Sequence, residues 1–167
     1  MTAQFFLLIV LGIVSLVLVV LLIRMIIYAS VMVHGAVFVR SDQDFIDAVL
    51  QEVARSKPKK IIDLGSGDGT IVLALAERGH TVDGIEINPI LAWKSQAEVR
   101  KRRLSAKIYR NSFWNVNLES YDMVIVYGTT YLMPKLEEKL LAELLPGAVV
   151  VSNFFEFPNW EVGESWG

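Results

Sequence analysis

The chain has 167 residues, a formal net charge of -2, 53% hydrophobic residues and no cysteine. This length suits one domain with an extension rather than two full domains. The charge excludes a generally basic nucleic-acid-binding protein, and the missing cysteine excludes disulfides, thiolate catalysis and cysteine metal sites. The two histidines, His34 and His80, lack metal-ligand spacing, so we expect no metal.

An uncharged apolar segment runs from Ala3 to Ile23. About 20 consecutive apolar residues suffice to cross a bilayer core, so residues 1–28 are predicted to be a transmembrane anchor. A cleavable signal peptide and a helix buried in a soluble core are the alternatives. No basic residue precedes the segment, whereas Arg24 and Arg40 follow it. This asymmetry favours a single-pass anchor with the rest of the chain on the cytoplasmic side or in an equivalent compartment.

The chain then divides into a predicted linker, residues 29–40, and one predicted domain, residues 41–167. An amphipathic helix is predicted from Ser41 to about Ser56, because apolar residues recur there at four-residue spacing. The residues on its apolar face are Phe45, Val49 and Val53.

The central feature of the sequence is a short apolar run, Ile61–Leu64, followed by Gly65, Gly67 and Gly69 and then by an apolar helix beginning at Thr70. A buried strand, a glycine turn and a helix form the usual cradle for a nucleotide-like ligand, since glycines let the backbone approach closely and helix amides face the ligand. The dinucleotide pattern G-x-G-x-x-G needs a glycine where Thr70 stands. A glycine-rich turn without a ligand is the alternative.

A second strand is predicted at residues 81–86, with Glu86 at its carboxyl end. An acid about 20 residues beyond a glycine loop is placed to accept hydrogen bonds from both ribose hydroxyls. An exposed strand-end acid is the alternative. The Asn88-Pro89 pair predicts the start of the next helix, which ends in the basic cluster Arg100–Arg103. That cluster is either a solvated helix end or a contact for anionic lipid headgroups.

Three further strands are predicted at residues 106–110, 123–126 and 148–152, with a helix at residues 136–145. The alternation of strands and helices predicts a mostly parallel, doubly wound sheet with helices on both faces. Ligands bind at the carboxyl ends of the strands in such sheets. Asn111 and Ser112 lie at one of these ends, where polar side chains suit an adenine edge.

The segment Asp63-Leu64-Gly65-Ser66-Gly67-Asp68-Gly69 resembles motif I of the class I S-adenosylmethionine-dependent methyltransferases. Three more segments narrow the resemblance: Glu86-Ile87-Asn88-Pro89, Met133-Pro134-Lys135-Leu136-Glu137 and Phe157-Pro158-Asn159-Trp160. With the apolar N-terminal segment, they make the chain similar to the membrane-anchored lysine methyltransferase family that modifies the ATP synthase c-subunit and the adenine nucleotide translocase in mitochondria, and to its prokaryotic relatives. The resemblance covers most of the chain after Ser56.

This resemblance implies a Rossmann-like class I methyltransferase sheet that uses S-adenosyl-L-methionine to methylate a lysine of a membrane protein, on the cytoplasmic or mitochondrial matrix side. No nucleic acid is expected as a partner. Whether the C-terminal hairpin of that class is present stays open, because seven residues follow Trp160. A lipid or small-molecule methyltransferase and a non-catalytic cofactor-binding module are the alternatives. The predicted cofactor-binding residues are Asp63, Gly65, Ser66, Gly67, Asp68, Gly69, Glu86, Asn88, Asn111 and Ser112.

No side chain stands out as the general base. A lysine acceptor must lose a proton, against a reference pKa of about 10.4, and an apolar aromatic surface would lower that pKa by desolvation. The candidates for orienting the amine or lining its site are Tyr127, Asn153 and Glu156. Further aromatic residues available to wall the site are Tyr131, Phe154, Phe155 and Trp160. Ordinary packing is the alternative role for each aromatic residue.

Overall fold

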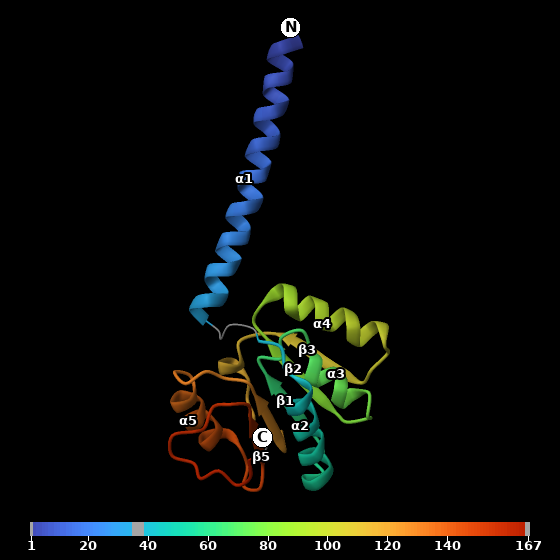
Figure 1. Ribbon diagram of the computed structural model, residues 1–167, viewed down its shortest axis with the longest axis vertical. Coiled ribbons are helices and arrows are strands. Elements are labelled where there is room, and N and C mark those ends of the chain that lie inside the picture. Colours follow the sequence, from blue (N-terminus) through green and yellow to red (C-terminus); the bar gives the residue numbers. More distant parts are fainter. Residues whose placement is uncertain (1, 35–38, 166–167) are drawn as a thin grey trace. The chain divides into compact units, whose positions relative to one another are not determined.

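The computed structural model describes residues 2–34 and 39–165, and it describes side chains for residues 4–26 and 39–165. The chain forms two compact units, Met1–Val37 and Phe38–Gly167 (Figure 1). The first unit is built on one long helix, and the second carries the sheet.

Helix α1 spans Thr2–His34. The predicted anchor ended at Tyr28, whereas α1 continues to His34 because no proline or glycine interrupts residues 29–34. Residues 35–38 of the predicted linker lie outside the described residues. Within α1, the segment Gln4–Ile26 has a mean hydropathy of 3.5 and is long and apolar enough to cross a bilayer. This criterion uses length and composition alone, and a signal sequence satisfies it too.

The second unit contains a five-stranded sheet in the order β3-β2-β1-β4-β5, and every neighbouring pair is parallel. The strands are β1 (Ile61–Leu64), β2 (Val82–Glu86), β3 (Ala106–Arg110), β4 (Met123–Val126) and β5 (Val149–Ser152). The helices are α2 (Gln43–Ser56), α3 (Thr70–Ala76), α4 (Pro89–Lys101) and α5 (Met133–Glu143), with a short 3-10 helix at Phe113–Asn115. The predicted doubly wound parallel sheet is confirmed. Within residues 39–165, no strand follows β5.

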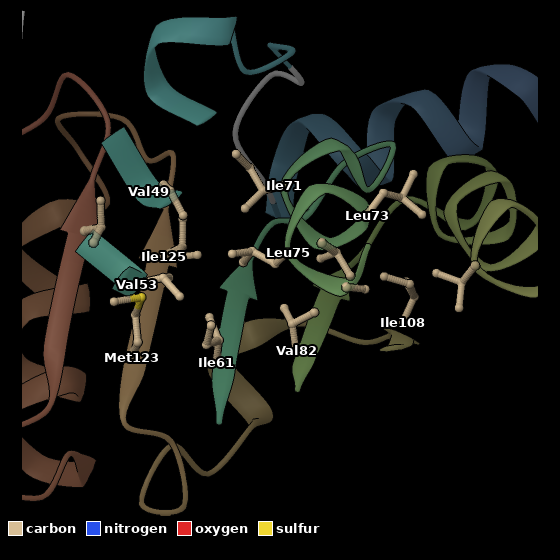
Figure 2. Packing of buried hydrophobic residues seen from close by; sticks show 14 of the residues in the cluster. Val49, Val53, Ile61, Ile71, Leu73, Leu75, Val82, Ile108, Met123 and Ile125 are labelled. Atoms are coloured by element: carbon tan, nitrogen blue, oxygen red, sulfur yellow. The ribbon is translucent and has the colours of Figure 1, made fainter. Parts of the chain in front are cut away.

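The sheet has a buried cluster on each face, because successive side chains of a strand point to opposite sides. Figure 2 shows Ile61, Val82, Met123 and Ile125 of the strands packed among side chains of α2 and α3. The other face of the sheet packs against α5 and the C-terminal segment through a cluster that includes Leu136, Leu140 and Phe157. Asp63 shares the face of Ile61, two residues earlier, so its side chain points towards the α2 side of the sheet.

Two helix starts differ from the prediction. The N-cap of α2 is Asp42, whose side chain accepts a hydrogen bond from the Phe45 amide at 2.9 Å, rather than Ser41. A carboxylate there satisfies one of the amides that a helix start leaves unpaired. Helix α5 begins at Met133 instead of Leu136, since Pro134 needs no amide partner in a first turn.

Candidate functional site

The glycine loop after β1 is held against β2 by its backbone. The amides of Gly65 and Ser66 both donate to the Ile85 carbonyl oxygen at 2.9 Å, and the Gly69 amide donates to the Ser66 carbonyl oxygen at 2.8 Å. Gly65 has φ +85°, and no atom lies within 4 Å of the place where a Cβ would stand. The loop therefore exposes backbone that a ligand can approach closely, as the sequence predicted.

Gly69 serves packing as well as turn geometry. Its φ is +84°, and a Cβ there would lie 2.7 Å from the Cβ of the fully buried Ser95 on α4. Gly69→Ala is therefore expected to lower the free energy of unfolding by about 2–4 kcal/mol, from backbone strain plus overpacking. Urea unfolding measures this loss. Gly79→Ala is the matched control, because Gly79 has the same φ of +84° but open space around it, and it should cost only about 1 kcal/mol. Equal losses in the two variants would contradict the packing role.

Glu86 organises the loop from the end of β2. One carboxylate oxygen accepts from the Gly67 amide at 2.8 Å, and the other accepts from the Asn88 amide at 2.6 Å. The side chain is buried, with 7% of its surface exposed. Each oxygen keeps a second lone pair for a ligand hydroxyl. The acid thus fixes the glycine loop to the end of β2.

Asp63 is a buried carboxylate that is left without a partner among the described residues. Asp63 is only 5% exposed, yet its side chain forms no hydrogen bond or ion pair with any described residue. Burial, and secondly the nearby charge of Glu86, raise the pKa of Asp63 to about 7. Its strand neighbours are Gly84 and Ile125, which donate no side-chain hydrogen bond. An unpaired buried acid with a raised pKa indicates a site for a cationic ligand group.

Asp63 lines a pocket that lies between the glycine loop, the end of β4 and the start of α2. Tyr127 closes one side of it, with its ring 6.5 Å from that of Phe45 and 5.9 Å from that of Phe154. Phe154 is 74% exposed. The pocket is lined by Val39, Ser41, Phe45, Asp63, Gly65, Ser66, Asp68, Thr70, Ile71, Ile125 and Tyr127.

Sequence reasoning missed part of this pocket. Asp68 accepts from the Thr70 hydroxyl at 2.6 Å and forms ion pairs with Arg40 at 3.6 Å and Lys94 at 3.8 Å. Arg40 also donates to the Thr70 hydroxyl oxygen at 3.3 Å. Residues before α2 therefore attach to the loop and wall the pocket. In the sequence, the only signal in this segment was the charge of Arg40, which we used to predict the orientation of the membrane anchor.

The remaining predicted residues divide between the site and its surroundings. The Asn111 amide donates to the Glu86 carbonyl oxygen at 3.1 Å, which brings Asn111 beside the acid. Its side-chain oxygen accepts from the Ser112 amide at 2.8 Å, so that oxygen is already used in a local turn. Asn153 is buried beside β4, since its amide donates to the Val126 carbonyl oxygen at 3.0 Å. Glu156 is exposed, and it does not line the pocket.

Three buried polar atoms at the carboxyl ends of the strands have no hydrogen-bond partner within the described part of the chain: Ser66 Oγ, Thr129 Oγ1 and Asn153 Nδ2. Buried polar groups are normally paired, so each indicates a place for a ligand or a water. Phe154, next to Asn153, has φ +64°, a conformation that costs an L side chain about 1 kcal/mol or more. The unpaired Asn153 Nδ2 and the strained backbone of Phe154 are therefore adjacent, and the Phe154 ring contacts that of Tyr127.

Comparisons with known proteins agree on one class. The sequence model of the ANTKMT methyltransferase domain matches residues 63–164. The chain is 38% identical over 115 residues to the lysine N-methyltransferase of the ATP synthase c-subunit from Mus musculus, covering 68% of this chain and 47% of the relative. It is 39% identical over 110 residues to the adenine nucleotide translocase lysine N-methyltransferase of Mus musculus, covering 64% and 48%. The chain thus spans about half the length of the curated relatives it matches.

A solved structure shows the same architecture. The RNA methyltransferase from Salinibacter ruber, in complex with S-adenosyl-L-homocysteine, aligns with a TM-score of 0.71 and 26% identity, over 77% of this chain and 86% of that chain. The fold is therefore that of a Rossmann-like methyltransferase.

Proposed function

Because the chain belongs to the family of the ANTKMT methyltransferase domain, we propose that it transfers a methyl group from S-adenosylmethionine to a lysine of a membrane-associated protein. The names of its relatives support this acceptor class. The observation that carries the proposal is one rim that holds two buried acids, Asp63 and Glu86, together with the contacting rings of half-buried Tyr127 and exposed Phe154. The acids suit a cationic nucleoside, and the rings suit the apolar stem of a lysine.

The residues present fit the cofactor. Glu86 keeps free lone pairs for a ribose diol, and the unpaired Asp63 carboxylate complements a positive charge. The open space at Gly65 admits the ligand against the backbone. We assign Gly67, Ser66, Asp68 and Gly69 to the supporting loop, and Asn88, Asn111 and Ser112 to the adenine side. When bound, S-adenosylmethionine supplies an electrophilic methyl group, so the protein's task is positioning.

On the acceptor side, the chain's residues must desolvate and orient an amine. An ammonium group has to release its proton before it becomes a nucleophile, and an aromatic wall that excludes water favours the neutral form. We assign this wall to Tyr127 and Phe154. We assign the orienting role to Asn153, and its buried side-chain Nδ2, which has no hydrogen-bond partner among the described residues, supports this assignment. Glu156, being exposed, is a weaker candidate for that role.

Phe154→Gly is expected to lower the rate of methyl transfer with little change in the free energy of unfolding. Glycine relieves the positive φ but gives the unfolded chain more freedom, so the two effects offset and the free energy of unfolding should change by less than about 1 kcal/mol. Loss of the ring from the acceptor wall should lower the single-turnover methylation rate about 10-fold, since acceptor positioning contributes to the rate. Cofactor affinity should stay unchanged. Leu141→Ala, which truncates another exposed apolar side chain, on α5, is the control and should leave the rate intact. A wild-type rate for Phe154→Gly would remove Phe154 from the acceptor site.

We also propose that Gln4–Ile26 anchors the chain in a membrane as a single span. The apolar length of the segment supports the span, and Arg24 at its C-terminal end and Arg40 beyond it support placing the second unit on the cytoplasmic or matrix side. Protease protection in sealed vesicles tests the side. Deleting the segment should abolish modification of a membrane substrate while cofactor binding persists; unchanged modification would overturn the anchor's role.

The central experiment is incubation of the full chain, in membranes, with methyl-labelled S-adenosylmethionine. We expect label on lysine residues of a membrane protein, located by mass spectrometry. Label in the lipid fraction would instead support a lipid methyltransferase. Binding of the cofactor by calorimetry without any transfer would support a non-catalytic cofactor-binding module.

A further inference from the structure

Although the net charge of the chain is -2, one segment of it is strongly basic. Residues 94–110 contain seven of the chain's 16 lysines and arginines and a single acid, Glu98. These cations are Lys94, Arg100, Lys101, Arg102, Arg103, Lys107 and Arg110, and we call them the basic edge. Such local charge asymmetry in an acidic chain indicates an anionic partner rather than a requirement of the fold.

The fold gathers these residues along one border of the second unit. β3 is an edge strand, and α4 packs directly against it (Figure 1). Gln96 on α4 donates to the Ile108 carbonyl oxygen of β3 at 2.9 Å, which fastens the two elements together. The turn between them carries Arg102 and Arg103. The cations therefore lie along one edge of the sheet, with Lys107 on the face opposite Ile108, which packs with α4.

Four of these seven cations are uncompensated. Lys94 forms an ion pair with Asp68 at 3.8 Å. Glu98 forms ion pairs with Lys101 at 3.7 Å and with Arg102 at 3.1 Å, while Glu77 forms one with Arg102 at 2.6 Å. The other cations of α4's end and β3 have no carboxylate within ion-pair distance among the described residues, and all of them are exposed. They are Arg100, Arg103, Lys107 and Arg110.

Exposed apolar side chains accompany the cations. Ile90 is 63% exposed and Trp93 is 66% exposed, both on α4, and Tyr109 on β3 is 43% exposed. Trp93 and Lys94 follow Ile90 by three and four residues, so both lie beside Ile90 on the helix surface. Tryptophan and tyrosine beside lysine and arginine are typical of the membrane–water interface, where rings sit at headgroup level.

We propose that the basic edge binds the anionic headgroups of a lipid bilayer. Exposed Ile90 has no use in binding a phosphate backbone, but it suits the acyl boundary below the headgroups. Cations near an anionic leaflet are attracted individually, so a group of unpaired ones gives strong binding when the chain is already tethered. This inference adds to the proposed anchoring by α1 and does not depend on catalysis. It concerns only the surface of the second unit.

The absence of cysteine allows a clean test with a single label. Ser105→Cys places a fluorophore in the exposed turn between α4 and β3 without removing a cation, and Glu138→Cys on α5 is the control position. The full chain is inserted into nanodiscs that contain spin-labelled quencher lipid. We expect quenching at position 105 in phosphatidylglycerol discs but not in phosphatidylcholine discs. The quenching should disappear at about 0.5 M salt, where charges are screened within a few ångströms. Position 138 should stay unquenched.

Charge reversal identifies the residues. Arg100→Glu, Arg103→Glu and Lys107→Glu combined should abolish quenching at position 105. The matched control reverses three exposed cations elsewhere, Lys57, Lys59 and Lys135, and should leave quenching intact. Thermal unfolding verifies that both triples fold. Equal quenching at both label positions, or no effect of the first triple, would overturn the proposal.

Two further outcomes are informative. If the chain does not enter discs, the anchor proposal fails by itself, and the same triple is tested on preformed phosphatidylglycerol vesicles. There it should weaken binding about 100-fold, and unchanged binding would overturn the lipid proposal. Binding to a single-stranded RNA oligonucleotide that the triple abolishes, with no lipid response, would reassign the basic edge to nucleic acid.

Discussion

Glu86→Gln is expected to weaken binding of S-adenosylmethionine about 100-fold. Both carboxylate oxygens of Glu86 accept backbone amides, from Gly67 at 2.8 Å and from Asn88 at 2.6 Å. A glutamine side chain has only one oxygen, so its NH2 group must face one of the two amides, donor against donor. A hydrogen bond to a charged group contributes about 1.5–3 kcal/mol, and losing one such bond while displacing the loop accounts for roughly two decades of affinity.

Isothermal titration calorimetry measures this loss directly. Glu119→Gln, at an exposed position between the 3-10 helix and β4, makes the same chemical change away from the site and should bind the cofactor like the wild type. Thermal unfolding distinguishes loop rearrangement from global unfolding, because Glu86→Gln should keep a cooperative transition. An affinity within threefold of the wild type would show that the ligand does not depend on this acid, and the cofactor site would have to be placed elsewhere.

The sequence predicted the elements whose ends carry a chemical marker. β1 ends at Leu64, directly before the glycines, and β3 and β4 also begin and end at the predicted residues. The start of α5 was placed too late because its apolar periodicity was used and the first-turn role of Pro134 was not. The starts of α3 at Thr70 and α4 at Pro89, which follow a glycine and the Asn88-Pro89 pair, match the prediction, so local markers locate element ends better than apolar periodicity does.

The sequence predicted the candidate site residues that belong to one local motif, and it did not predict the residues that approach this motif from a distant part of the chain. The loop and Glu86 form one unit, as their spacing indicated. Phe45 lines the pocket only through the packing of α2 on the sheet, and Arg40 contacts Asp68 of the loop from the segment before α2. No local pattern in the sequence records either approach. Asn111 lies beside Glu86, but its side-chain oxygen is engaged by Ser112, which depends on the turn conformation. Residue spacing predicts neither which distant elements pack together nor which conformation a turn adopts.

Asp63→Asn is expected to make the protein more stable and the site less functional. The folded pKa of Asp63, about 7, lies above its ordinary value of 3.8, because burial and then Glu86 oppose the charge. The favourable contribution to stability is complete below pH 3.8 and is lost as pH rises towards 7. Asparagine stays neutral throughout. The variant should therefore gain stability over the wild type as pH rises from 5 to 8, by at most about 3 kcal/mol, since only the interval from pH 5 to about 7 contributes and one pKa unit corresponds to ~1.4 kcal/mol.

Cofactor binding should show the opposite preference. A cationic ligand favours the ionised carboxylate, so the affinity of the wild type, relative to that of Asp63→Asn, should rise about 10-fold between pH 6 and pH 8. Using the ratio to the variant removes titration of the ligand itself. Melting curves and calorimetry over this range give both quantities from one pair of proteins. A constant ratio would mean that Asp63 does not face the ligand charge.

These two measurements together separate a functional acid from a structural one. A buried acid retained for stability would be satisfied by hydrogen bonds, and its removal would destabilise the fold at neutral pH. Asp63 has no such partner among the described residues. A variant that melts higher at pH 8 yet binds the cofactor more weakly would show that the fold bears an unfavourable buried charge which the ligand neutralises. The unpaired carboxylate at the end of β1 would then be the group that makes this glycine loop selective for a cationic nucleoside.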